Sequence, residues 1–336
     1  MATMTSAERV MCALRREEPD HVPHFEWLIA ANVRTALCPS AKTHLDFALA
    51  MDHDALLVDP DWRKEQVGPT RYRSEWGYVL DYGHEEHGVE VESPIASSAD
   101  FERYQAPDPC APGRFATLER VVAEHKGKKA IGVHLNDVFS VPRYLMGMEN
   151  LLYAVADEPE LVRALVKLSV DTNLALAKEV AARGADFVWT GDDYAGNAGP
   201  LMSPKSFREL FWPGLCRVAQ GFAELGLPFI KHCDGNIWPI IDLRVEAGPS
   251  ALDPIDQQGG MDLAEVKAKF GDRVAIKGNV DCAEVLPFGT VEETIAETRR
   301  AIREGAPGGG FILSSSNSIH SSVKPENYAA MMDTWR

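Results

Sequence analysis

Short apolar segments recur along the chain at the spacing of β-strand and α-helix pairs, and this alternation constrains the fold most. The segments lie near residues 24, 56, 132, 188, 229, 252, 275 and 312. Stretches long enough for a helix separate most of them, which is the pattern of a parallel sheet. Eight such units favour a closed (β/α)8 barrel, a TIM barrel, over an open sheet. No GxGxxG motif follows the first segment and no Walker loop is present, which argues against a dinucleotide-binding or P-loop fold.

One region interrupts this rhythm, between about residues 60 and 112. Two stretches there, 75–82 and 89–92, alternate apolar and polar residues with the period of two that is typical of exposed strands. Gly83 and Gly88 lie between them, which predicts a β-hairpin inserted after the second barrel strand. We therefore expect a single domain, residues 1–336, that carries this insertion.

Charge and cysteine usage narrow the class of function. The net charge of −16 argues against binding of nucleic acid, because phosphate binding requires clustered Lys and Arg. The six cysteines are scattered and form no CxxC pair, and no segment approaches the roughly 18 apolar residues that a membrane span requires. Together with an N-terminus that lacks an apolar signal region, these features predict a cytoplasmic protein with no membrane partner.

Polar residues follow most of the expected strands, at the ends where TIM barrels place their active sites. A single Asp or Asn at such a place is often only a helix cap or a turn residue. Clusters at seven strand ends, however, predict a polar pocket. The candidate residues are Glu26, His134, Asn136, Asp137, Asp192, Asp193, Tyr194, His232, Cys233, Asp234, Asp253, Asp256, Asn279, Asp281, Asn317 and His320. Trp27, Trp62 and Trp76 fall in loops or in the insertion and could wall an aromatic pocket.

The fifth expected strand ends in three potential metal ligands, His232, Cys233 and Asp234. Residues i and i+2 of a strand face the same way, so His232 and Asp234 are expected to point into the barrel mouth and Cys233 away from it. Imidazole, carboxylate and thiolate groups all bind zinc. The alternative is a histidine held by an aspartate in a structural hydrogen bond, with Cys233 as a small core residue.

Several motifs resemble the uroporphyrinogen decarboxylase superfamily over nearly the full length of the chain, which implies a (β/α)8 barrel. They are Glu8–Leu14 with Pro19–Pro23, Ala198–Pro204 with Phe207 and Arg208, Gly278–Asp281, and Lys324–Asn327. True decarboxylases hold the carboxylates of a porphyrinogen with the arginines of an Arg-Gln-Ala-Gly-Arg stretch after the first strand. The equivalent stretch here, Glu26–Ala30, has no arginine, and Asn317 stands where those enzymes have a histidine. An acidic pocket would repel a polycarboxylate, so uroporphyrinogen decarboxylation is not expected.

The other branch of the superfamily is similar to cobalamin-dependent methyltransferases. Members that methylate coenzyme M carry a His-x-Cys-Gly motif after the fifth strand and another Cys after the eighth, all of them zinc ligands. Here Asp234 and Asn317 stand at the two Cys positions, and members that cleave methyl ethers resemble this pattern better. The resemblance implies zinc held by His232 and Asp234, with Cys233 as a further candidate. It also implies cobalamin carried by a separate corrinoid protein, because the chain shows no corrinoid-binding loop of the Asp-x-His-x-x-Gly type.

The leading hypothesis is therefore a corrinoid-dependent methyltransferase component of the O-demethylase type, which takes methyl from a small O-methylated aromatic donor. The residues then expected to be catalytic are Glu26, Asp193, His232 and Asp234. Those expected to bind substrate are His134, Asn136, Tyr194, Asn279, Asp281, Asn317 and His320. The enzyme alternative is a decarboxylase or other lyase for another small acid, with Arg34 and Arg143 as the cations. A third reading is a non-enzymatic barrel that binds a metal or a tetrapyrrole. A homodimer is compatible with all three readings.

Overall fold

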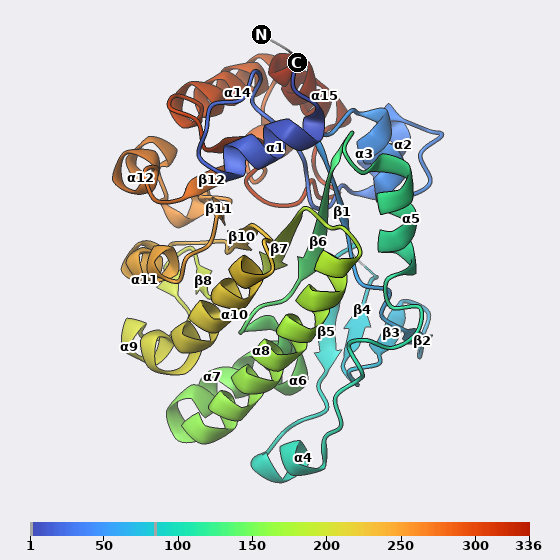
Figure 1. The fold of residues 1–336 in the computed structure, drawn as a ribbon, viewed down its shortest axis with the longest axis vertical. Helices are drawn as coiled ribbons and strands as arrows, with labels where there is room; N and C mark the ends of the chain where they lie inside the picture. Colours follow the sequence, from blue (N-terminus) through green and yellow to red (C-terminus); the bar gives the residue numbers. More distant parts are fainter. Residues whose placement is uncertain (1–2, 84–85) are drawn as a thin grey trace.

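The protein, described here from a computed structural model over residues 3–83 and 86–336, is a curled parallel sheet surrounded by helices (Figure 1). The sheet order is β1-β6-β7-β10-β11-β12-β13, so neighbours in space follow the order of the chain. The strands are β1 (Ala55–Val58), β6 (Ala130–Leu135), β7 (Phe187–Gly191), β10 (Phe229–His232), β11 (Ala251–Asp253), β12 (Ala275–Val280) and β13 (Phe311–Ser315). This architecture confirms the expected barrel of alternating strands and helices.

The first of the eight expected strands is reduced to a single bridge. His24 pairs in parallel with Leu313 of β13, and its carbonyl accepts a hydrogen bond of 2.8 Å from the backbone N–H of Asp54, just before β1. The segment therefore lies between the two edge strands and closes the sheet. A regular ladder does not form, because Pro23 has no N–H and the N–H of His24 bonds to the carboxylate of Asp54 at 3.0 Å.

Helices cover the outside of the sheet (Figure 1). They are α1 (Ser6–Leu14), α2 (Ala31–Leu37), α3 (His44–Ala50), α4 (Ser98–Arg103), α5 (Ala116–His125), α6 (Ser140–Met146), α7 (Met148–Asp157), α8 (Pro159–Ala182), α9 (Pro204–Ser206), α10 (Trp212–Glu224), α11 (Ile241–Glu246), α12 (Leu263–Phe270), α13 (Val285–Phe288), α14 (Val291–Gly305) and α15 (Pro325–Trp335). A π-helical turn (Phe207–Phe211) and two 3-10 turns (Trp238–Ile240, Gln257–Gly259) complete the set. None of the described helices combines the length and the apolar character that a membrane crossing needs.

Alternate residues of each strand face the inside of the barrel and the layer of helices. The inner residues form a small apolar cluster that includes Leu57, Phe187 and Trp189, and α1 closes one end of it with Val10 and Leu14. Their sequence neighbours face outward into a much larger core beneath the helices. α1 itself begins with a capping box, in which Thr5 and Glu8 bond to each other's backbone N–H.

Gly132 shows how tightly the inside of the barrel is filled. A side-chain carbon at this position would lie 2.4 Å from the ring of Phe187 on the neighbouring strand. Only glycine leaves room for that ring. The barrel interior is thus a packed core and not a pore, which restricts any binding site to its mouth.

The insertion is larger than the expected hairpin. It forms a four-stranded antiparallel sheet of β2 (Lys64–Gln66), β3 (Arg71–Ser74), β4 (Val79–Asp81) and β5 (Val89–Glu92). The expected pair is present as β4 and β5, but the first strand starts at residue 79 and not at 75, because the chain turns at Gly77 with a positive φ of 90°. In Figure 1 this sheet lies toward the end of the barrel to which the β6 arrow points.

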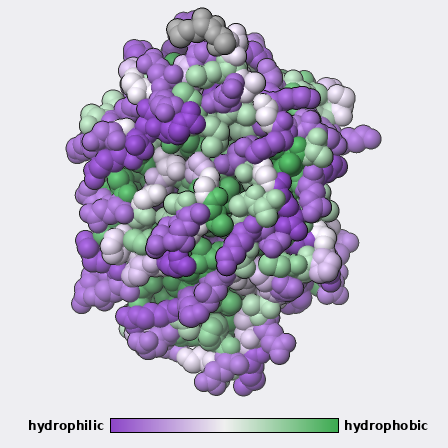
Figure 2. All heavy atoms as spheres, in the orientation of Figure 1, coloured by the Kyte–Doolittle hydropathy of each residue, from purple (hydrophilic) through white to green (hydrophobic). Residues whose placement is uncertain are grey.

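The face seen in Figure 2 is mostly hydrophilic, with apolar side chains in small areas between the charged ones. This agrees with the net charge of −16. The first helix, α1, and the last, α15, lie at the opposite end of the molecule from α4 (Figure 1).

Candidate functional site

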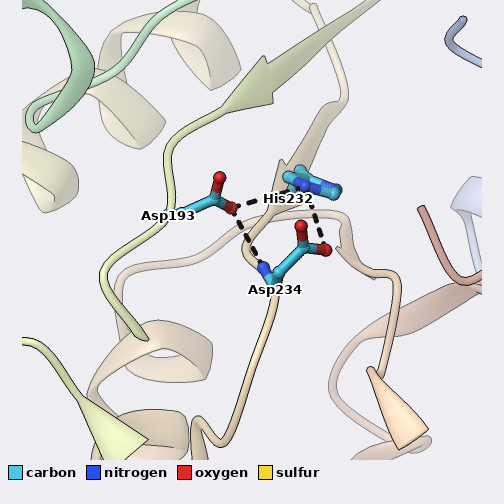
Figure 3. Close-up of side chains that lie close together, drawn as sticks. All are labelled: Asp193, His232 and Asp234. Carbon is cyan, nitrogen blue, oxygen red and sulfur yellow. Dashed lines mark hydrogen bonds and ion pairs between the residues drawn. The ribbon is translucent and has the colours of Figure 1, made fainter. Parts of the chain in front are cut away.

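Three side chains from two neighbouring strand ends converge at the barrel mouth (Figure 3). Asp193 follows β7, His232 is the last residue of β10, and Asp234 lies two residues further on. The Nε2 atom of His232 lies 3.4 Å from Oδ1 of Asp234 and 3.5 Å from Oδ1 of Asp193. The backbone N–H of Asp234 donates to Oδ1 of Asp193 at 3.0 Å, which fixes the two acidic residues relative to each other.

The other ring nitrogen of His232 is held from inside the barrel. Its Nδ1 lies 3.0 Å from Oδ2 of Asp253, a carboxylate at the end of β11. The indole N–H of Trp189 donates to the same oxygen at 2.6 Å, and Lys277 of β12 pairs with the other oxygen at 3.0 Å. With Nδ1 engaged by a carboxylate, Nε2 is the nitrogen presented to Asp193 and Asp234.

The electrostatics of the group follow from burial and from close charges. Burial would lower the pKa of His232, but Asp234 and Asp253 outweigh it and raise that pKa well above the usual value. Burial raises the pKa of Asp234 to about 6, against the effect of His232. Burial would also raise the pKa of Asp253, but Lys277 and His232 hold it well below its usual range. Asp253 is therefore a permanent anion beneath the group, while Asp234 can change charge near neutral pH.

The three residues fit a divalent metal ion. Their ligand atoms all lie within 4.8 Å of one another. Oδ1 of Asp234 is buried and accepts no hydrogen bond from any described residue, whereas its Oδ2 accepts one from the side-chain amide of Asn317. Imidazole nitrogen and carboxylate oxygen are zinc ligands, and an Asp–His contact behind the ligand is the usual way of orienting it.

A cavity of about 570 Å³ opens between the barrel mouth and the inserted sheet. Ten of its lining residues carry aromatic or imidazole rings: Trp27, His44, Trp62, Tyr72, Trp76, Tyr78, Tyr82, His87, His134 and Tyr144. The expectation that Trp27, Trp62 and Trp76 wall a pocket is confirmed. Trp27 connects the cavity to the His232 group. Its ring stacks on that of Trp189, with 5.2 Å between ring centroids, and the ring of Trp189 lies 5.0 Å from that of His232, again between centroids.

Two predicted substrate-binding residues, His134 and Asn136, line this cavity, and a third, Asn317, contacts Asp234. His134 is held through Nδ1 by Asp59 at 2.6 Å. The candidates that reach the mouth are thus divided between two adjoining places, the cavity and the His232 group.

Glu26, Cys233 and Tyr194 lie on the outer side of the sheet, away from the group. Both oxygens of Glu26 accept hydrogen bonds of 2.8 Å from Ser315. Burial raises the pKa of Glu26 to about 7. The Sγ atom of Cys233 accepts the backbone N–H of Tyr194, as strand parity predicts for a residue between His232 and Asp234. The hydroxyl of Tyr194 bonds to the buried carboxylate of Asp137 at 2.7 Å.

Asn279, Asp281 and His320 have structural partners in the loops. The amide of Asn279 donates to the carbonyl of Ile255 at 2.9 Å. Asp281 accepts two backbone N–H groups at the start of the following turn, and His320 bonds to the carbonyl of Cys282 at 2.8 Å. The structure does not bring these three residues to the His232 group.

The sequence pattern assigned no role to three polar residues of the mouth: Asp59, Lys277 and Asp253, the last of which was only a candidate at its strand end. All three have the parity of inner-facing strand residues, because they stand two positions after Leu57, Ala251 and Ala275 of the inner cluster. This alternation was the available signal. In the sequence, Asp59 and Asp253 look like ordinary turn residues at the ends of strands, and Lys277 looks like a solvent-exposed lysine. Their residue types therefore did not indicate a role at the mouth.

Comparison with known proteins shows to which family the chain belongs. The model of the family "Uroporphyrinogen decarboxylase (URO-D)" matches residues 74–336. A uroporphyrinogen decarboxylase from Thioalkalivibrio sulfidiphilus is 23% identical over 271 residues, which are 75% of this chain and 72% of that protein. A methylated-thiol–coenzyme M methyltransferase from Methanosarcina mazei is 27% identical over 175 residues, 50% of this chain and 43% of that protein.

Among solved structures, a methyltransferase from Methanosarcina mazei superposes with a TM-score of 0.76 and 18% sequence identity, over 99% of this chain and 98% of that one. This likeness establishes a shared fold. Relatives of the chain thus include both decarboxylases and methyltransferases, and the resemblance seen in its motifs is confirmed. Since the family model covers most of the sequence, the chain belongs to the uroporphyrinogen decarboxylase family.

Proposed function

We propose that this protein transfers a methyl group from a small aryl methyl ether to the cobalt of a corrinoid carried by a partner protein. The observation that carries the proposal is the aromatic cavity beside the Asp193–His232–Asp234 group. Its volume of about 570 Å³ falls in the range of small-molecule sites. Ten ring-bearing residues on its walls suit a flat aromatic donor, which stacks on such rings.

The chemistry of an aryl methyl ether requires assistance at oxygen, because a phenoxide is a poor leaving group. Asp193, His232 and Asp234 would hold zinc, which when bound supplies a Lewis acid. Asp253 keeps the ring of His232 in place, and Asn317 orients Asp234 through its Oδ2 atom. The stacked indoles of Trp27 and Trp189 keep an apolar surface between cavity and group.

The choice of methyl transfer is supported by the methyltransferase relatives and by the composition of the mouth. The cavity walls contain Asp59, Asp61 and Glu86 but one lysine, Lys64. Such a lining disfavours a polycarboxylate substrate of the porphyrinogen type. A corrinoid on a second protein is the acceptor that the His232–Gly235 motif suggests.

The test is to mix the protein with a reduced corrinoid protein and a set of methoxyarenes and to follow the methylcobalamin absorbance. Wild type is expected to methylate the corrinoid with at least one donor. The rate of methyl transfer is expected to fall by about 100-fold or more in His232→Ala, because this variant loses an imidazole that would be both a zinc ligand and a carrier of positive charge. Absence of methylcobalamin with every donor would count decisively against the proposal.

A second candidate is a decarboxylase or lyase acting on another small acid, and one observation favours it. The guanidinium of Arg143 lies 4.3 Å over the ring of Tyr144, a cavity residue, and forms no ion pair with any residue of 3–83 or 86–336. Arg34, by contrast, is bound to Glu86 at 2.7 Å. Carbon dioxide release from small aromatic acids, abolished in Arg143→Gln, would support this candidate, and no release from wild type would remove it.

A further inference from the structure

Asp59 and His134 form a carboxylate–imidazole pair at the mouth that is separate from the Asp193–His232–Asp234 group. The register of β1 and β6 pairs Val58 with Val133, so the next residue of each strand lies beside the other. Nδ1 of His134 lies 2.6 Å from Oδ1 of Asp59, and both residues line the cavity. Partial desolvation would raise the pKa of Asp59, but the hydrogen bond and charge of His134 outweigh it and lower that pKa. The pair therefore keeps an anionic carboxylate at neutral pH.

The second nitrogen of His134 is open toward the mouth. Its Nε2 accepts or donates no hydrogen bond to any other residue of the described chain. A side-chain carbon at Gly191, at the end of β7, would lie 3.4 Å from it, so glycine leaves the space beside this atom clear. The ring centroids of Trp27 and Trp189 lie 5.6 and 4.9 Å from the centroid of the His134 ring, and these contacts fix the imidazole plane. His134 is thus held by a carboxylate on one side and free on the other.

The position of this pair differs from that of the metal-capable group. His134 and Asp59 are cavity residues, whereas Asp193, His232 and Asp234 are not among the residues that line the cavity. The indole of Trp189 contacts the rings of both His134 and His232, at 4.9 and 5.0 Å. A donor in the cavity therefore meets the Asp59–His134 pair directly.

We infer that the protonated ring of His134 gives its Nε2 proton to the oxygen of a methyl donor bound in the cavity, and that Asp59 positions the ring for this step. This rests on the proposed methyl transfer. The bond between methyl carbon and oxygen breaks and leaves its electron pair on the oxygen. The methyl group passes to the reduced corrinoid, which supplies both electrons of the new bond. The proton of His134 neutralises the oxygen, so that a phenol leaves, and water reprotonates the ring.

Proton donation by His134 can be distinguished from a purely structural role by how the rate depends on the acidity of the leaving phenol. A general acid matters most for a weakly acidic leaving phenol and least for a strongly acidic one, such as a nitrophenol. The rate of transfer should therefore depend more steeply on leaving-group acidity when the acid is removed. His134 is then the catalytic residue and Asp59 the positioning residue.

The experiment measures methyl transfer to a reduced corrinoid protein from anisoles with electron-donating and electron-withdrawing ring substituents. His134→Gln is expected to slow transfer from the parent ether by about 100-fold to 10,000-fold and from a nitro-substituted ether far less. Asp59→Asn, which hardly changes side-chain volume, is expected to steepen the same dependence to a smaller degree. It provides the measurement if His134→Gln does not fold.

His125→Gln is the matched control, because this histidine ends α5 near the opposite end of the strands and is outside the cavity lining. It should keep the wild-type dependence on leaving-group acidity. Equal slowing of every donor in His134→Gln and Asp59→Asn would overturn the inference while leaving the proposed function intact. Wild type that transfers methyl from no donor would instead overturn both.

Discussion

At the scale of single residues, strand parity decides which polar side chains reach the mouth. His232 and Asp234 face inward and meet Asp193, while Cys233 between them faces the helices. Glu26 also carries a carboxyl group, but it faces outward to Ser315. Chemical type alone therefore does not identify a site residue in a barrel strand, because the neighbouring residue has the opposite environment.

Glu26 leads to a prediction about pH. Burial raises its pKa from the ordinary 4.5 to about 7. Between these two values the folded protein holds a proton that the unfolded chain has released, so this group makes stability fall as pH rises through that window. Glu26→Gln removes the titration. We expect the variant to match wild type near pH 4 and to exceed it by about 3 kcal/mol at pH 8, at about 1.36 kcal/mol per pKa unit.

Urea unfolding of both proteins at pH 4 and pH 8 measures this difference. The glutamine retains an oxygen that accepts the N–H of Ser315, so the cavity around it need not change. A stability difference that is the same at both pH values would contradict the assigned titration.

Part of the residue-level picture was available from the sequence, and its limits have a physical cause. The pairing of His232 with Asp234 follows from their spacing within one strand, which is local. The contacts of His232 with Asp253 and of Asp253 with Lys277 join three different strands. Such contacts depend on strand register across the barrel, which no local pattern encodes. The same holds for Asp59 and His134.

At the scale of elements, the insertion shows which strands the alternation of polar and apolar residues cannot predict. Its last two strands alternate in polarity and were predicted, whereas β2 has three exposed residues, Lys64 to Gln66, and no apolar face to mark it. β2 is held by its ladder to β3, and β3 by its ladder to β4. The segment expected to be the first barrel strand forms only a single bridge for a different reason: Pro23 has no backbone N–H to donate to a ladder.

Arg114, just before α5, holds together segments from the start, the middle and the end of the insertion. Its side chain is 1% exposed, its guanidinium lies 3.7 Å over the ring of Trp62, and it bonds to Glu75 and to the carbonyl of Asp61. Arg114→Met keeps the bulk but leaves Glu75 without its partner. We expect a loss of about 3 kcal/mol in stability, as for other broken buried pairs, and weaker donor binding.

Hydrogen exchange would locate the effect of this change, with faster exchange over residues 61–82 than over the barrel strands. The control is Arg71→Gln, because Arg71 pairs with Asp81 at a side-chain exposure of 52% and such surface pairs contribute less than about 1 kcal/mol. A uniform increase of exchange across the barrel would show that Arg114 supports the whole fold and not the insertion alone.

At the scale of the whole molecule, the barrel brings residues from distant parts of the sequence to one place. The His232 group unites the ends of β7 and β10, Asn317 adds the end of β13, and the aromatic cavity adds the insertion. A ligand that joins Asp193, His232 and Asp234 therefore links segments that separate when the chain unfolds. Its binding free energy should appear as stability of the entire barrel.

Zinc titration followed by unfolding tests this coupling. An ion that binds the folded state alone raises its stability by about 2.7 kcal/mol when free zinc is 100 times the dissociation constant. We expect this gain in wild type and its absence in His232→Ala and in Asp193→Asn with Asp234→Asn. Cys233→Ser should keep the gain, because its sulfur faces Tyr194 and not the group. A gain lost in Cys233→Ser would place the thiol among the ligands and require β10 to turn at its end. Wild type without any gain would mean that His232 and its carboxylates act as a proton-carrying group without zinc.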